Sequence, residues 1–274
     1  MATKKNEVAK AQTTAVALPH DYSAYEDDAI QLGMDDLSIP FVSLVQTDSK
    51  VLDPEEDNYV PGGEAGQLLD SSRRQYHNEL LLVPALKDHK FVEWLPDRGG
   101  YAGEHDPKSP VVRQAIKGED GTLRRADGPN ELAETKSLWC IICEGDDLNP
   151  VGFCVVPFTG SKFRPWRQYW DRVNTMKGSH RIPPMALTIR LTSKDEKNQK
   201  GKKYKNYVMH PARDESGALT TDPNASDVAT SLLSPEHPAF QAAAQLREAI
   251  QSGRATVDRE TANNEETKSG ERHF

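Results

Sequence analysis

The sequence predicts a mainly β domain with added helices, of the α+β class. Its apolar residues fall into short runs bounded by Gly, Pro, Asn and Asp, which is typical of strands joined by turns. Two pairs of these runs are close enough in sequence to form hairpins, and two other segments have the three- and four-residue apolar spacing of a helix. Since 28% of the 274 residues are charged and only 36% are hydrophobic, we expect part of the chain to remain unpacked.

Composition divides the chain into three parts. Residues 1–36 are polar and then acidic, and we expect a flexible N-terminal arm; its acidic residues include Asp21, Glu26, Asp27, Asp28, Asp35 and Asp36. Residues 37–212 contain the apolar runs and are predicted to fold as one domain. Residues 213–274 are predicted to form a polar, largely disordered C-terminal tail with one helix at about 235–252, because Ser234, Pro235 and Gly253 are suitable cap, first-turn and terminating residues.

The predicted strands are the apolar runs at 39–45, 80–84, 90–94, 137–143, 151–156, 186–192 and 204–209. The run at 137–143 pairs naturally with 151–156, and 186–192 pairs with 204–209 across a lysine-rich loop. The polar stretch at 106–134 is predicted to be a loop insertion with one short helix near 110–117.

A helix is predicted from Lys162 to Met176. Its apolar residues recur at three and four positions and define one face; they are Phe163, Trp166, Trp170 and Val173. Ser161 could cap this helix, and Pro165 is acceptable because it falls in the first turn. Tyr169 lies at the edge of the apolar stripe, so we expect its ring to be the one within reach of a ligand.

Charge is distributed very unevenly along the chain. Residues 161–210 contain thirteen Lys or Arg and three Asp or Glu, a local charge of +10, whereas the remaining residues sum to −18 and the whole chain to −8. Large aromatic residues are interleaved with these cations. Cations for phosphates and flat rings for unstacked bases are what a protein needs to bind single-stranded nucleic acid.

The sequence therefore predicts a nucleic-acid site in this basic segment. The phosphate-binding candidates are Lys162, Arg164, Arg167, Arg172, Arg190, Lys202, Lys203 and Lys205, and the base-stacking candidates are Tyr169, Tyr204 and Tyr207. Strand alternation places Tyr204 and Asn206 on one side of their strand and Lys205 and Tyr207 on the other. The alternative is that the helix aromatics pack on the sheet, while the arginines and the lysine loop form an ordinary solvated surface.

Catalytic chemistry is not expected. Cys140, Cys143 and Cys154 lie in apolar runs without a second cysteine pair or a neighbouring His, so we interpret them as buried thiols rather than a zinc, redox or disulfide site. A metal-dependent nuclease remains an alternative because four acids lie near one another in sequence; these are Glu93, Asp97, Glu104 and Asp106. Their spacing matches no standard metal-ligand motif, and we expect neither enzymatic activity nor a cofactor.

The sequence contains no run of about 20 apolar residues, and its N-terminal residues lack an apolar signal segment. We therefore expect a cytoplasmic protein.

Several short motifs resemble those of tailed-bacteriophage proteins described as single-stranded DNA-binding proteins. In order along the chain they are Ile39-Pro40-Phe41, Pro61-Gly62-Gly63, Phe91-Val92-Glu93-Trp94 with Arg98-Gly99-Gly100, and Phe158-Thr159-Gly160-Ser161-Lys162 with Trp166. The resemblance extends from about Ile39 to Met209. It implies a five-stranded β-barrel of the oligonucleotide-binding (OB-fold) type, with the helix at 162–176 as an addition.

The resemblance also implies sequence-tolerant single-stranded DNA binding in phage DNA replication or recombination. Such proteins commonly end in an acidic tail with a terminal aromatic residue that recruits replication or recombination proteins. Phe274 fits this pattern, although residues 258–274 sum to only −2. A structural or scaffolding phage protein without DNA affinity is the main alternative, since an acidic surface and long tails suit it equally.

Overall fold

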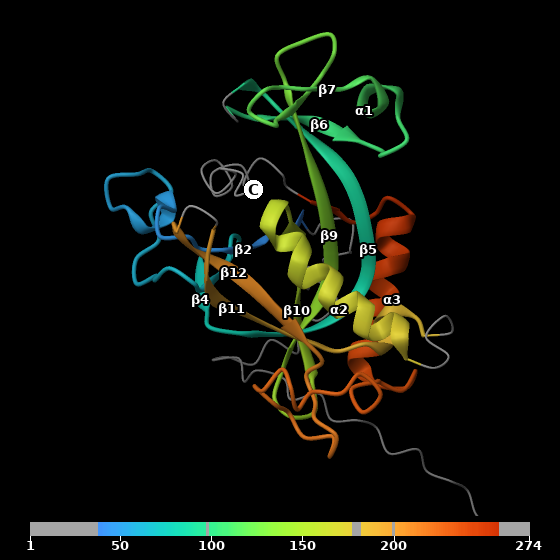
Figure 1. Ribbon diagram of the computed structural model, residues 1–274. Helices are drawn as coiled ribbons and strands as arrows, with labels where there is room; N and C mark the ends of the chain where they lie inside the picture. Colours follow the sequence, from blue (N-terminus) through green and yellow to red (C-terminus); the bar gives the residue numbers. More distant parts are fainter. Residues whose placement is uncertain (1–37, 97–98, 177–181, 199–200, 258–274) are drawn as a thin grey trace, which may run out of the picture. The chain divides into compact units, whose positions relative to one another are not determined.

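The computed structural model describes residues 38–96, 99–176, 182–198 and 201–257 (Figure 1). Over these residues the protein is mainly β with added helices, as the sequence predicts. The predicted acidic N-terminal segment at 1–36 lies outside the described residues. So does the end of the predicted tail, residues 258–274 with Phe274.

The largest sheet has eight strands in the described part of the chain. Their order is β12–β11–β5–β9–β8–β7, with β10 paired to β9 and β6 paired to β5. The strands are β5 (Leu80–Trp94), β6 (Tyr101–His105), β7 (Ile116–Lys117), β8 (Leu123–Arg124), β9 (Glu131–Glu144), β10 (Asn149–Phe158), β11 (Ile189–Lys197) and β12 (Lys203–His210). Both predicted hairpins are confirmed, as β9–β10 and β11–β12.

The two short strands predicted at 80–84 and 90–94 are one continuous strand, β5, so this prediction was wrong. The register between β5 and β9 shifts between Pro84 and Leu86, which leaves Ala85 as an extra residue. A bulge of this kind lets a strand accept a proline, which has no backbone N–H to donate. The strand therefore continues past Pro84 instead of ending there.

A smaller antiparallel sheet contains β2 (Val42–Leu44), β3 (Leu68–Asp70) and β4 (Gln75–His77), and β1 (Ser38–Ile39) pairs in parallel with β13 (Thr256–Val257). The segment around β2 joins two edge strands of the large sheet, β10 and β12. On one side the Val155 N–H of β10 donates to the Pro40 carbonyl oxygen at 2.8 Å. On the other side the Gln46 side chain exchanges two hydrogen bonds with the Lys205 backbone of β12, at 3.0 and 3.1 Å. The large sheet is therefore curled, with residues 40–46 between its edges.

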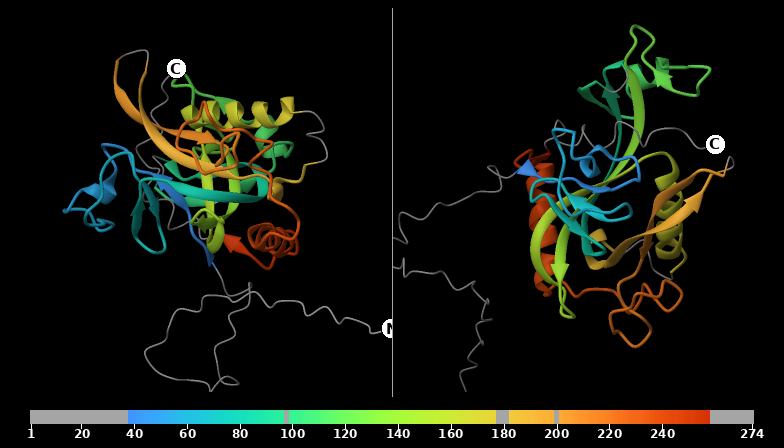
Figure 2. Two further views of the ribbon diagram at one scale, coloured as in Figure 1. Left: turned by 90° about the horizontal axis from the view of Figure 1, so that it is seen from below. Right: turned by 90° about the vertical axis from the view of Figure 1, so that its left-hand side faces the viewer.

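Two helices pack on opposite faces of β5 and β9 (Figure 2). Because side chains alternate along a strand, β9 contributes residues to the interfaces with both helices. Leu138, Cys140 and Ile142 face the inside of the curled sheet and the helix α2 (Phe163–Thr175). The intervening residues Trp139 and Ile141 face α3 (Pro238–Gln251). Both faces of this part of the sheet are therefore buried.

The helix predicted at 162–176 is confirmed as α2, with Trp166, Trp170 and Val173 buried. The predicted Ser161 cap is wrong, because Lys162 occupies the N-cap position and its side chain makes no capping hydrogen bond. The second predicted helix is confirmed as α3 but begins three residues later than expected. Residues 234–237 form a turn, and His237 caps α3 by accepting a hydrogen bond from the Ala239 N–H at 3.1 Å.

α3 belongs to the core of the folded domain. Its buried face consists of Ala239, Ala243, Leu246 and Ala249, which are at most 1% exposed. All of the described residues fall in one unit, Met34–Phe274. The predicted boundary at residue 212 therefore does not separate the folded domain from a tail, because α3 packs on β5, β9 and β10.

The residues between β5 and β9 form a projecting arm with the far ends of these two strands (Figure 1). We call residues 86–96 and 99–137 the arm. The short helix predicted near 110–117 is confirmed as α1 (Pro110–Gln114), but β7, β8 and the start of β9 replace part of the predicted loop at 106–134. Three 3₁₀ helices complete the described elements: η3 (Lys50–Leu52), η5 (Gly160–Lys162) and η7 (Pro184–Ala186). No helix within the described residues is long and apolar enough to cross a membrane.

Candidate nucleic-acid interface

The hairpin formed by β11, β12 and the residues between them carries most of the predicted lysines, and we call it the basic hairpin. Its register places Tyr204 opposite Glu196, and Lys203 opposite Lys197. Tyr204 therefore lies on one face and Tyr207 on the other, as alternation predicts. Lys202 and Lys203 are exposed at the end of this hairpin.

Tyr204 is the predicted stacking residue that remains within reach of solvent, because its side chain is only half-buried. Its hydroxyl donates to Glu196 Oε2 at 2.9 Å, and the Asn206 amide donates to the same oxygen at 2.8 Å. Burial raises the pKa of Glu196, but hydrogen bonds from Lys194, Asn206 and Tyr204 outweigh burial and lower it to about 2. An ionised Glu196 thus holds the Tyr204 hydroxyl while part of the ring stays open.

The first turn of α2 lies beside β12, where the Asn206 amide donates to the Ser161 carbonyl oxygen at 3.4 Å. Burial and the Glu196 hydrogen bond raise the pKa of Tyr204, whereas Ser161 and the positive charge of Arg164 act in the opposite direction. Arg164 is exposed, and so is Arg167 one turn further along, whose Nε donates to the Phe163 carbonyl oxygen at 3.4 Å. The structure therefore brings Arg164, Tyr204 and the end of the basic hairpin together.

The other predicted cations have different surroundings. Arg190 is 5% exposed and forms an ion pair with Glu79, so its guanidinium is not available to bind a phosphate at the surface. Lys162 is 7% exposed, with its Nζ 5.3 Å from the centroid of the Tyr207 ring. Lys205 is half-buried, and its Nζ lies 2.9 Å from Asp195 Oδ1. Arg172 is exposed near the other end of α2, where it donates to the Pro223 carbonyl oxygen at 3.0 Å.

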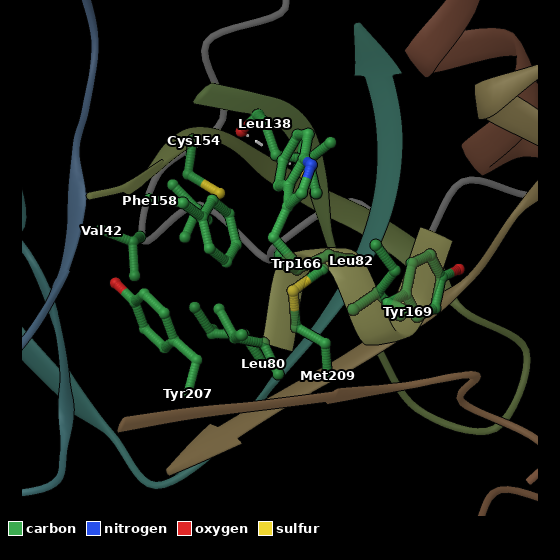
Figure 3. Close-up of a cluster of buried hydrophobic side chains, with 14 of the residues drawn as sticks. Val42, Leu80, Leu82, Leu138, Cys154, Phe158, Trp166, Tyr169, Tyr207 and Met209 are labelled. Carbon is green, nitrogen blue, oxygen red and sulfur yellow. Dashed lines mark hydrogen bonds between the residues drawn. The ribbon is translucent and has the colours of Figure 1, made fainter. Parts of the chain in front are cut away.

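The prediction that Tyr169 and Tyr207 stack on bases is corrected by their burial. Each side chain is 1% exposed and belongs to the core inside the curled sheet (Figure 3). Tyr169 packs edge-on against Trp170, and its hydroxyl donates to the Thr188 carbonyl oxygen at 3.1 Å. The apolar face of α2 is wider than the predicted stripe, so a residue at its edge is enclosed. Tyr207 is enclosed because its face of β12 continues into the core.

Sequence reasoning missed two lysines that lie against α2. Lys87 of β5 has its Nζ 3.8 Å from the centroid of the Trp170 ring, and Lys136 of β9 has its Nζ 5.2 Å from that of Phe163. Burial lowers the pKa of Lys87. Both lysines fall outside the basic segment at 161–210. The signal that could have found Lys87 is the alternation of Lys87, His89 and Phe91 along one face of a strand.

The three cysteines are free and buried, which confirms their interpretation as core thiols. Cys140 and Cys154 lie opposite each other in β9 and β10. Burial raises the pKa of Cys143 to about 12, and burial together with the neighbouring Cys154 also raises that of Cys140. The Cys140 and Cys143 thiols therefore stay protonated near neutral pH, the form that is unreactive as a nucleophile or metal ligand.

The acids of the nuclease alternative do not gather in the part of the chain that the structure describes. Glu93 is buried and binds Arg125, Asn130 and His105. Asp97 lies outside the described residues. Among the residues that are described, no three His, Cys, Asp or Glu side chains are grouped closely enough to hold a metal ion.

Comparison with known proteins places the chain in a phage family. The model of the family described as Pam3 phage gp34-like protein matches residues 10–256. A search of curated proteins and a search of solved structures each found no match. The match covers every described element except the last residue of β13, so it includes the curled sheet, the arm and both long helices. The chain therefore belongs to the Pam3 phage gp34-like protein family.

Proposed function

We propose that this protein binds single-stranded DNA with little sequence preference and acts in phage DNA replication or recombination. The observation that carries the proposal is the cluster at the start of α2. There the Asn206 amide of β12 donates to the Ser161 carbonyl oxygen at 3.4 Å, which brings half-buried Tyr204 and the exposed Lys202 and Lys203 of the same hairpin near exposed Arg164. Single-strand binding proteins combine cations that track the phosphates with rings that accept the bases. The role in replication or recombination is taken from the resemblance to phage single-stranded DNA-binding proteins.

The strand connections support an oligonucleotide-binding barrel. β5, β9 and β10 follow one another as antiparallel neighbours, and β11 returns to pair with the first of them after α2. This is the Greek-key order on which the oligonucleotide-binding fold is built. Its ligands bind on the second and third strands and on the loops between strands one and two and between strands four and five. In this chain those loops correspond to the arm and to the end of the basic hairpin.

α3 excludes one part of this usual ligand surface, the face of the second and third strands. It covers the outer face of β9 and β10, where Trp139, Ile141 and Val155 pack beneath Ala243 and Leu246. A strand of DNA would have to displace this apolar contact to use that face. We therefore assign the DNA to the side of the basic hairpin and α2, where the exposed cations lie.

The salt dependence of binding tests this assignment. Each phosphate contact on a single strand contributes about 0.7 to the slope of log affinity against log salt. Changing Lys202 and Lys203 together to Gln should therefore flatten the slope by about 1.4. The matched control is Arg247→Gln with Arg254→Gln, which removes the same charge on and after α3 and should leave the slope unchanged. A slope unaffected by the lysine changes would remove the basic hairpin from the site.

A second pair of variants tests base stacking on Tyr204. Tyr204→Phe keeps the ring and should retain affinity. Tyr204→Ala should lower affinity about 5- to 150-fold, because one base–aromatic contact contributes about 1–3 kcal/mol. Equal affinity of the two variants would exclude this ring from the interface.

Gel shifts with single- and double-stranded oligonucleotides, with and without Mg²⁺, separate the proposal from its alternatives. A DNA-binding protein retards the single strand in both buffers. A structural or scaffolding protein retards neither DNA and forms multimers, and a metal-dependent nuclease removes the oligonucleotide only when Mg²⁺ is present. Either of the last two results would contradict single-stranded DNA binding.

A further inference from the structure

We propose that the bound single strand continues past the basic hairpin, along the first two turns of α2, and onto a second cationic surface of the β5–β9 arm. We call it the lysine–aromatic surface, and its residues are Lys87, Phe91, Lys136, Phe163 and Arg167. The inference rests on the proposed function and extends it by naming where the strand leads after Tyr204.

The lysine–aromatic surface is assembled from three elements. In the β5–β9 register Lys87 is opposite Leu138 and His89 is opposite Lys136, so the two lysines are diagonal neighbours on one face of the sheet. Each ammonium group then lies over a ring of α2, Lys87 over Trp170 and Lys136 over Phe163. These contacts fix two cations beside the same helix that carries Arg164 and Arg167.

The surface is open to a ligand. Lys87 and Arg167 are exposed, while Lys136, Phe91 and Phe163 are half-buried. The half-buried ring of Phe163 beside Lys136 thus repeats the combination of ring and cation found at Tyr204. The nearby Glu134 points its carboxylate to the arm itself, with Oε1 3.0 Å from His89 Nε2.

Among the described residues, no carboxylate forms an ion pair with Lys87 or Lys136. Both ammonium groups are held against rings, and burial of Lys87 lowers its pKa. A partly desolvated cation gains more from an arriving anion than a fully hydrated one does. A phosphate of a single strand is therefore a suitable partner for each of them.

The geometry also sets the expected length of DNA. Phe163 and Trp170 are separated by two helical turns, about 10 Å along α2. At about 3.4 Å per nucleotide, the spacing in a stacked strand, this corresponds to about three nucleotides. The oligonucleotide needed for full affinity should therefore be about three nucleotides longer than one that reaches only the basic hairpin.

The experiment compares the full-length protein with the variant Lys87→Met, Lys136→Met, in which the aliphatic stems can stay on the rings. Removing two phosphate contacts should flatten the salt slope by about 1.4, so the affinity deficit of the variant should shrink about sevenfold between about 50 mM and about 200 mM salt. With single strands of increasing length, the affinity of the variant should level off about three nucleotides earlier than that of the wild type. The variant Arg247→Gln, Arg254→Gln again serves as the charge-matched control.

The results separate this inference from the function on which it rests. If the wild type binds and the Lys202, Lys203 variant loses slope, but the Met variant has wild-type slope and length dependence, the lysine–aromatic surface is overturned while DNA binding stands. If the wild type does not bind a single strand, both proposals fail. The variant Lys87→Arg, Lys136→Arg keeps both charges and should restore the wild-type slope; failure to do so would mean that the loss came from altered packing and would overturn the inference.

Discussion

At the scale of single residues, Glu93 shows how a buried charge can hold the arm together. Its side chain is 3% exposed and accepts hydrogen bonds from Asn130 at 2.6 Å and from Arg125 at 3.2 and 3.3 Å, with His105 as a further partner. Burial raises the pKa of Glu93, but these hydrogen bonds outweigh burial, so the pKa lies below its ordinary value of 4.5. β5, β6 and the residues before β9 are therefore joined through one ionised carboxylate.

The pH dependence of stability follows from this lowered pKa. The folded state favours the ionised form, so Glu93 stabilises the fold above the unfolded pKa, and this contribution is lost as the pH falls through the folded pKa. Glu93→Gln should lower the free energy of unfolding at neutral pH by about 2–4 kcal/mol, because it breaks a buried charged network. Urea denaturation should show this deficit shrinking in acid below the folded pKa.

The exposed contact between His89 Nε2 and Glu134 Oε1 on the same arm, at 3.0 Å, is the control for that measurement. Glu134→Gln should change the free energy of unfolding by less than about 1 kcal/mol, since both side chains are in contact with water. A deficit for Glu93→Gln that is the same at neutral and acid pH would contradict the role of the ionised carboxylate.

At the scale of elements, the Gln46 side chain, two residues after β2, binds the backbone of β12. The Gln46 amide donates to the Lys205 carbonyl oxygen and accepts from the Lys205 N–H, as a neighbouring strand would. We call this contact between Gln46 and Lys205 the seam. It matters for the candidate site, because Tyr204 is the residue before Lys205 in β12. We infer that Gln46 sets the position of the basic hairpin against β2.

Hydrogen exchange at the Lys205 amide tests this seam. Gln46→Ala removes the acceptor, and the amide should exchange about fivefold faster, corresponding to about 1 kcal/mol for one hydrogen bond. Gln46→Glu keeps an oxygen in the same place and should leave the Lys205 amide protected. Unchanged exchange in Gln46→Ala would show that another group protects this amide.

Element prediction from sequence succeeded where periodicity is strong. The apolar spacing of α2 and the alternation around Tyr204 both survive in the structure because they reflect local geometry. It failed where a neighbouring strand decides the outcome: Pro84 suggests a strand end, but pairing with β9 absorbs it in a bulge. The start of α3 was misplaced because Ser234 and His237 are both followed by proline, and only the observed turn distinguishes them.

At the scale of the whole molecule, two further properties were out of reach of the sequence. Lys87 and Lys136 are far apart in the chain, and only the pairing of β5 with β9 brings both beneath α2. The burial of Tyr169 likewise depends on β11 and the residues before it, whose Thr188 carbonyl oxygen accepts its hydrogen bond. The local charge of +10 at residues 161–210 therefore indicated the region of the candidate site but did not identify the residues that form it.

The position of α3 leads to the last prediction, which concerns where the folded domain ends. α3 covers five large apolar side chains of the sheet, namely Leu81, Val83, Trp139, Ile141 and Val155. Burying each of these contributes about 1.5–3 kcal/mol, so together they are comparable with the whole stability of a typical domain, about 5–15 kcal/mol. A chain ending at Ala212 should therefore show no cooperative unfolding transition in urea, whereas a chain ending at Val257 should unfold cooperatively.

A point substitution tests, without truncating the chain, the same prediction that α3 belongs to the folded domain. Leu246→Ala removes a fully buried side chain of α3 and should lower the free energy of unfolding of the entire domain by about 2–5 kcal/mol. Because α3 and α2 pack on opposite faces of the same two strands, circular dichroism and the fluorescence of Trp166 and Trp170 should report one shared transition. Two separate transitions, with α3 melting first, would instead make α3 a detachable cover of the β9–β10 face, and that face would then become available to DNA.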